Sequence, residues 1–149
     1  MKYTEKISKQ LNELLIKNYD AEKGYVNAAN SVNSERLKVF FNKCASERST
    51  FAKDLRTEIL RYGEEPSATG SFKGIAHRNW VSLKSLFSTN NEEVILEEAL
   101  KGENASLEAY NDLLKSENLP SNIEALILKQ KNAIKDTIEA ERVQEELVS

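Results

Sequence analysis

Glu103 is the residue whose position most strongly suggests chemistry. It interrupts an apolar stripe at helical spacing in the stretch 96–114, LEEALKGENASLEAYNDLL. The apolar members of this stripe are Leu96, Leu100, Leu107, Tyr110 and Leu114. Because an isolated charge is expensive to bury, a carboxylate at this position must be protonated, paired with a cation or bound to a metal ion.

Three further polar residues, Asn18, Arg48 and Gln130, fall on the inward stripes of other predicted helices. Asn18 lies seven residues before Tyr25, and Glu103 lies seven residues before Tyr110. This shared spacing predicts matching layers of two related helices. The stripe of the last helix reads Ile123, Ile127, Gln130, Ile134, Thr137 and Glu141. All four long helices therefore carry polar residues on their inward sides.

Two arrangements are open for Arg48. It could pair with Glu103 across the core and supply the positive charge that a metal ion would otherwise bring. Alternatively, its aliphatic stem packs while its head reaches solvent, which is the commoner behaviour of arginine and the one we expect. For Asn18, Arg48, Glu103 and Gln130 together, we favour a closed hydrogen-bond network that fixes the helix register. The alternative is one hard cation held by Glu103 and neighbouring carbonyl oxygens.

Four long helices must position these residues, at about 4–32, 34–62, 91–115 and 122–147, in a single domain over 1–149. The expected N-caps are Thr4, Asn33 or Ser34, Asn90 and Ser121, and Gly63 is the expected helix stop. A shorter helix is expected at about 71–87, inside a connection of 28 residues. The prediction is an all-α, up-down four-helix bundle whose long helical crossover lets the third long helix run parallel to the second.

His77, Trp80 and Cys44 each have a chemical and a structural interpretation. The single histidine, His77, could act as a general base, but no nucleophile or substrate pocket is marked beside it. We expect His77 to anchor the crossover helix by a hydrogen bond. In the same helix Trp80, with Phe72 and Phe87, is the expected partner surface. Cys44 lies on an apolar stripe and is expected to be a buried structural thiol.

Composition and charge exclude several classes of protein. The net charge of −3 and the pI of about 5.4 argue against a general nucleic-acid binder. Residues 1–90 carry +5 and residues 91–149 carry −8, which we interpret as two helical hairpins that attract each other. No apolar run is long enough to span a bilayer, and no signal-peptide core is seen, so a cytoplasmic protein without membrane contact is expected.

Four stretches of the chain resemble one known group of proteins: YDAEKGYVNAA, FAKDLRTEI, SFKGIAHRNWVSLKSLF and EEALKGENASLEAY. The chain is similar, from about Ile7 to Arg142, to an uncharacterised bacterial branch of the ferritin-like superfamily. Members of this branch are described only as ferritin-like four-helix-bundle proteins with a domain of unknown function. The resemblance implies a ferritin-like bundle and brings no established activity.

The di-metal ligands of ferritin-like enzymes are largely missing from this chain. Such enzymes use a Glu from each of two helices and a Glu-x-x-His from each of the other two. Glu103 matches one ligand, whereas Asn18, Arg48 and Gln130 occupy the other carboxylate positions and no Glu-x-x-His is present. One carboxylate and an arginine do not hold two iron ions, so oxidase chemistry is not expected.

The expected function is therefore that of a non-enzymatic scaffold or interaction module without a cofactor, with a homodimer or another protein as partner. One alternative is a metal-binding oxidative-stress protein with a degenerate or single-metal site. A second alternative is a small-molecule carrier with a pocket between the bundle and the crossover helix. Stoichiometric metal or a co-purifying ligand would distinguish these two from the scaffold.

Overall fold

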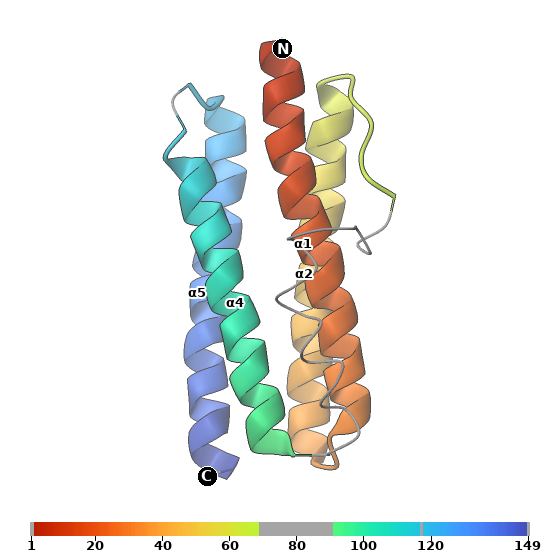
Figure 1. Ribbon diagram of the computed structural model, residues 1–149, viewed down its shortest axis with the longest axis vertical. Helices are drawn as coiled ribbons and strands as arrows, with labels where there is room; N and C mark the ends of the chain where they lie inside the picture. Colours follow the sequence, from red (N-terminus) through yellow and green to blue (C-terminus); the bar gives the residue numbers. More distant parts are fainter. Residues whose placement is uncertain (1, 69–90, 117, 149) are drawn as a thin grey trace.

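The computed structural model describes residues 2–68, 91–116 and 118–148, and these form a bundle of four long helices (Figure 1). The helices are α1 (Tyr3–Ser31), α2 (Glu35–Arg61), α4 (Glu92–Leu114) and α5 (Ser121–Val148). Every end lies within one residue of its expected position, and the described residues contain no strand. The predicted crossover helix at 71–87 lies outside the described residues.

The direction of each helix and its contacts define the arrangement of the bundle. In Figure 1, α1 and α5 run downward while α2 and α4 run upward, so α2 and α4 are parallel. Helix α1 packs against α2 and α4, and α5 packs against α4 and α2. The pairs α1 with α5 and α2 with α4 therefore lie diagonally across the bundle. No helix in the described part of the chain is long and apolar enough to cross a membrane.

Local capping explains both ends of α2 and corrects the expected start of α4. The hydroxyl of Ser34 accepts a hydrogen bond from the Leu37 N–H at 3.3 Å, as expected for an N-cap. At the other end Gly63 has φ +76°, a left-handed conformation that glycine adopts without strain. The N-cap of α4 is Asn91 rather than Asn90, because the Asn91 side chain is the one that accepts from Val94 N–H.

The predicted caps at Thr4 and Ser121 are wrong. The N-cap of α1 is Lys2, which makes no side-chain capping hydrogen bond, and Thr4 lies inside the helix. Ser121 is the first helical residue of α5, since the carbonyl of Pro120 accepts the first hydrogen bond, from Glu124 N–H at 2.9 Å. In both cases a hydroxyl residue lies one or two positions inside the helix, where its side chain does not cap the first turn.

The cap at Ser34 provides a test of the turn between α1 and α2. We expect Ser34→Ala to lower the free energy of unfolding by about 0.5–2 kcal/mol, because the Leu37 N–H loses its acceptor. The carboxylate of Glu92 also accepts from the N–H groups of Asn33 and Ser34, at 3.1 and 3.0 Å, and these bonds are kept in the variant. Urea denaturation measures the loss. A loss as large for Ser49→Ala, an exposed mid-helix control, would contradict it.

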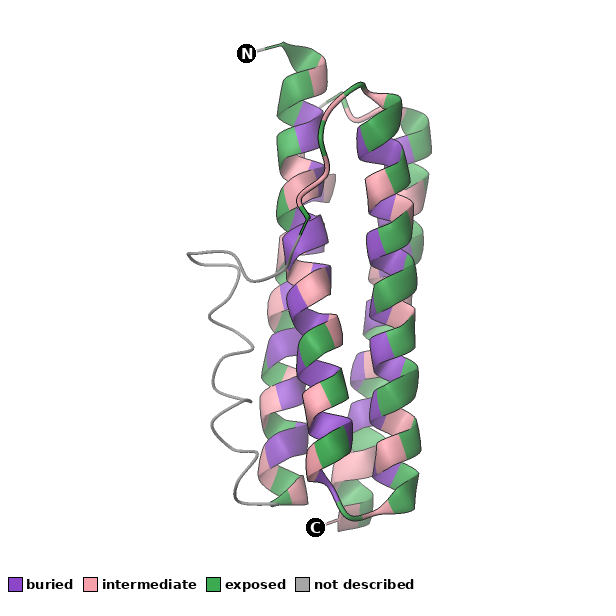
Figure 2. Ribbon diagram, turned by 90° about the vertical axis from the view of Figure 1, so that its right-hand side faces the viewer, coloured by how far each residue is buried: buried purple, intermediate pink, exposed green. Residues whose placement is uncertain are grey.

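Two apolar clusters fill the bundle, one toward each end. One contains Leu11, Leu55 and Tyr110, and the other contains Tyr25 and Phe41. Along α1, α2 and α4 the buried residues of the two clusters are separated by a buried polar layer. Figure 2 shows the buried positions on the inner faces of the helices and the exposed ones outside.

The buried face of α4 is rotated from the predicted stripe. Glu103, Leu96 and Tyr110 are buried as expected, but Leu100, Leu107 and Leu114 are only half-buried. The second line of the buried face consists of Ala99, Ser106 and Leu113. These residues follow the heptad spacing of a packed seam, and two of its positions carry small side chains. The leucines flank that seam.

Candidate functional site

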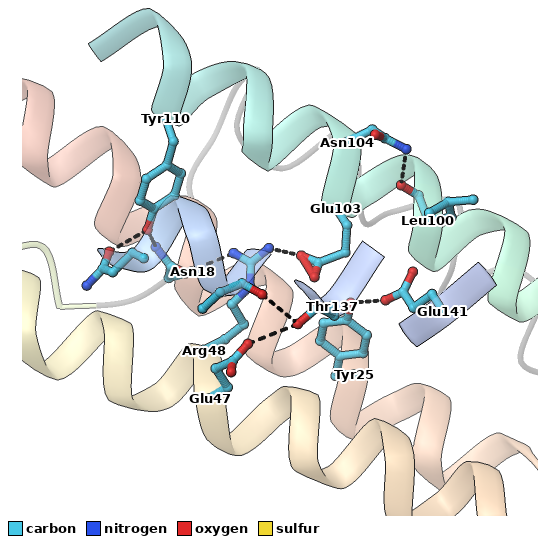
Figure 3. A network of polar contacts seen from close by, with 12 residues as sticks. Asn18, Tyr25, Glu47, Arg48, Leu100, Glu103, Asn104, Tyr110, Thr137 and Glu141 are labelled. Carbon is cyan, nitrogen blue, oxygen red and sulfur yellow. Dashed lines mark hydrogen bonds and ion pairs between the residues drawn. The ribbon is translucent and has the colours of Figure 1, made fainter. Parts of the chain in front are cut away.

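Arg48 lies at the centre of the buried polar layer and joins three helices (Figure 3). Its side chain is 1% exposed. Its Nη1 donates to Asn18 Oδ1 at 2.8 Å, and its Nη2 donates to Glu103 Oε1 in an ion pair. The expectation that the Arg48 head reaches solvent is therefore wrong. The side chain starts from the inward face of α2, and its two Nη groups find acceptors inside the bundle.

The Arg48–Glu103 pair connects α2 to α4, which lie diagonally across the bundle. Burial by itself lowers the pKa of the Arg48 guanidinium, but the Glu103 carboxylate together with Tyr25 and Tyr110 holds that pKa above its ordinary value. Arg48 is thus a permanent cation inside the bundle. Each partner compensates a charge that would otherwise be isolated from water, so the loss of either one leaves a buried charge unpaired.

A chain of hydrogen bonds extends the layer from Arg48 toward the α4–α5 side. The amide of Asn18 donates to the hydroxyl of Tyr110 at 2.9 Å and to the Leu14 carbonyl at 2.8 Å. Tyr110 donates to Gln130 Oε1 at 2.6 Å, and Gln130 donates to the Phe51 carbonyl at 3.3 Å. Burial raises the pKa of Tyr110 to about 12, so its hydroxyl remains a donor at neutral pH. All four predicted polar residues thus belong to one network.

A second diagonal contact, between Tyr25 on α1 and Glu141 on α5, was not predicted. The hydroxyl of Tyr25 donates to Glu141 Oε1, and both residues are fully buried. The sequence contained a partial signal, because Glu141 falls on the inward stripe of the last helix and Tyr25 on that of the first. Spacing along two helices that do not pack side by side gives no means of pairing them.

Glu141 is a buried carboxyl group, and its two oxygens differ in their hydrogen bonding. Its Oε2 is buried and has no hydrogen-bond partner among the described residues. Burial, and then the negative charge of Glu103, raise the pKa of Glu141 well above its ordinary value, while the Tyr25 hydroxyl and Arg48 oppose this shift. Burial, the missing donor at Oε2 and the nearby Glu103 charge thus all favour the protonated form of Glu141.

Glu47 and Cys44 lie on α2 beside the polar layer. Glu47 is half-buried and accepts a hydrogen bond from the Thr137 hydroxyl at 3.1 Å, across the α2–α5 seam. Burial raises the pKa of the Glu47 carboxyl group. Cys44 is a buried free thiol, as predicted, and burial raises its pKa so that the thiol form is favoured. A protonated thiol is a poor nucleophile and metal ligand, which fits a structural role.

The four residues at the expected metal-ligand positions do not form a donor set for two hard cations. Arg48 is itself a cation, and the amide oxygens of Asn18 and Gln130 accept from Arg48 and Tyr110. Glu103, the one carboxylate of this group, is already in an ion pair. Within residues 2–68, 91–116 and 118–148, no cluster of three or more His, Cys, Asp or Glu is arranged to hold a metal ion.

The remaining predicted candidates, His77 and Trp80, lie outside the described residues, as does the carrier pocket expected beside the crossover helix. The sequence model of a family described as a domain of unknown function, DUF2383, matches residues 6–116. This match covers most of α1 and all of α2 and α4, and with them Asn18, Arg48 and Glu103. Helix α5, with Gln130 and Glu141, follows the matched residues. No curated protein matches the chain. The chain belongs to the DUF2383 family of domains of unknown function.

Proposed function

We propose that this protein is a non-enzymatic helical-bundle module, a scaffold or interaction protein whose interior is held by polar side chains instead of metal ions. The observation that carries the proposal is the Arg48–Glu103 ion pair at the centre of the bundle. A guanidinium repels metal cations, and here it occupies the carboxylate of the one residue that matches a di-metal ligand.

As part of the same proposal, the fold is of the ferritin-like type. The parallel direction of α2 and α4 supports it, because ferritin-like bundles contain one long crossover. So does the position of the polar layer, which lies in mid-bundle and takes residues from all four helices. The module would act through its outer surface, by binding a protein partner or a second copy of the chain.

Elemental analysis tests the proposal. We expect protein purified after iron and manganese supplementation to contain no stoichiometric metal, and Glu103→Ala to leave the metal content unchanged. Glu93→Ala, an exposed carboxylate on the same helix, is the matched control. Two metals per chain that disappear in Glu103→Ala but not in Glu93→Ala would overturn the proposal in favour of redox chemistry. One such metal would instead favour a metal-binding protein with a reduced site.

A further inference from the structure

We propose that Glu141 is a proton-operated latch: it binds α5 to α1 as a neutral acid, and loss of its proton loosens this diagonal contact. The contact is the hydrogen bond from the Tyr25 hydroxyl to Glu141 Oε1. Because α1 and α5 do not lie side by side, this bond spans the core and connects two diagonally placed helices. The inference is independent of the proposed function.

The titratable and charged groups around Glu141 come from all four described helices. Tyr25 lies on α1, Arg48 and Cys44 on α2, Glu103 on α4, and Glu145 on α5 itself. The Glu47 carboxylate on α2 also raises the pKa of Cys44. Among these groups Arg48 is the one cation, and Glu103 already neutralises it. A charged Glu141 would therefore place a second buried negative charge against a single positive one.

The hydrogen bond from Tyr25 by itself favours the ionised form of Glu141, but the absence of a donor at Oε2 among the described residues favours the neutral form. An ionised carboxylate needs donors at both oxygens, whereas only Oε1 of Glu141 receives one among the described residues. The ionised form would thus leave a charged oxygen, Oε2, buried without a donor, which costs more free energy than leaving a neutral hydroxyl there. Ionisation then favours movement of the α5 carboxyl group toward water and away from Tyr25.

The stability of the fold is expected to fall as the pH rises. The pKa of Glu141 is raised in the folded protein above its ordinary value of 4.5, so the folded state retains a proton that the unfolded chain has lost. Above about pH 5, unfolding releases this proton, and the folding equilibrium constant falls by up to about tenfold for each pH unit until the folded group also ionises. Burial raises the pKa of Tyr25 and Tyr110, so their hydroxyl groups do not contribute near neutral pH.

The decisive experiment combines infrared spectroscopy with denaturation from pH 5 to pH 9. At pH 7 in D2O we expect the C=O band of a protonated carboxylic acid that disappears in Glu141→Gln. We also expect Glu141→Gln to show a shallower fall of stability with pH than the wild type. Glu139→Gln, an exposed carboxylate on the same helix with 73% of its side chain accessible, is the control and should match the wild type.

A second variant, Tyr25→Phe, tests the proposal independently if Glu141→Gln fails to fold. Tyr25→Phe removes the hydroxyl that stabilises the ionised carboxylate, so its acid band should persist to higher pH than that of the wild type. Hydrogen exchange provides the structural readout: protection of the amides in the last three turns of α5 should fall as the band disappears. Absence of the band at pH 7, or unchanged protection while it titrates away, would overturn the latch.

Discussion

Replacement of Arg48 by Met is expected to lower the free energy of unfolding by about 3–5 kcal/mol. The variant keeps most of the side-chain volume but removes the guanidinium, which leaves the Glu103 carboxylate buried without its cation. Asn18 also loses the donor at its Oδ1. Urea denaturation followed by circular dichroism at pH 7 measures the change.

A double-mutant cycle distinguishes charge from packing. We expect Arg48→Met combined with Glu103→Leu to recover much of the loss, because an apolar pair in place of a buried ion pair is often neutral or stabilising. Arg56→Met is the control: Arg56 is half-buried and donates to the Tyr19 hydroxyl at 3.1 Å near the surface. The ion-pair explanation fails if the double variant is less stable than Arg48→Met alone.

Removal of the Tyr110 hydroxyl is the second large effect. We expect Tyr110→Phe to lower the free energy of unfolding by about 1–3 kcal/mol, because the hydroxyl is both donor to Gln130 and acceptor from Asn18. The ring and its packing remain, so the loss reports on the polar layer. Urea denaturation at pH 7 is again the measurement.

Two comparisons define what Tyr110→Phe reports. Tyr19→Phe removes a part-buried hydroxyl near the surface and should cost less, since water replaces its lost hydrogen bonds. Tyr110→Phe and Gln130→Leu should be non-additive, because each removes the same hydrogen bond. Additive losses would mean that Tyr110 and Gln130 contribute independently, contrary to a connected network.

The sequence by itself determined the helices and the faces on which their polar residues lie. Apolar periodicity, with the polar breaks between stripes, placed every end of the four described helices within one residue, since few Gly or Pro residues interrupt the pattern. It also placed Asn18, Arg48, Glu103 and Gln130 on inward faces, because a residue's face follows from its position within a 3.6-residue turn. All four are buried in the structure.

Only the tertiary structure decided which of these residues meet. Arg48 pairs with Glu103, and Tyr25 with Glu141, across the two diagonals of the bundle. Such pairs depend on how far each helix is rotated about its axis and shifted along it. Packing of all four helices sets both quantities, as the half-buried Leu100 and Leu107 at the edge of α4's seam demonstrate. The apolar periodicity of one helix specifies neither its rotation nor its shift relative to the others. The charge balance at the centre of this protein is therefore a property of the assembled bundle.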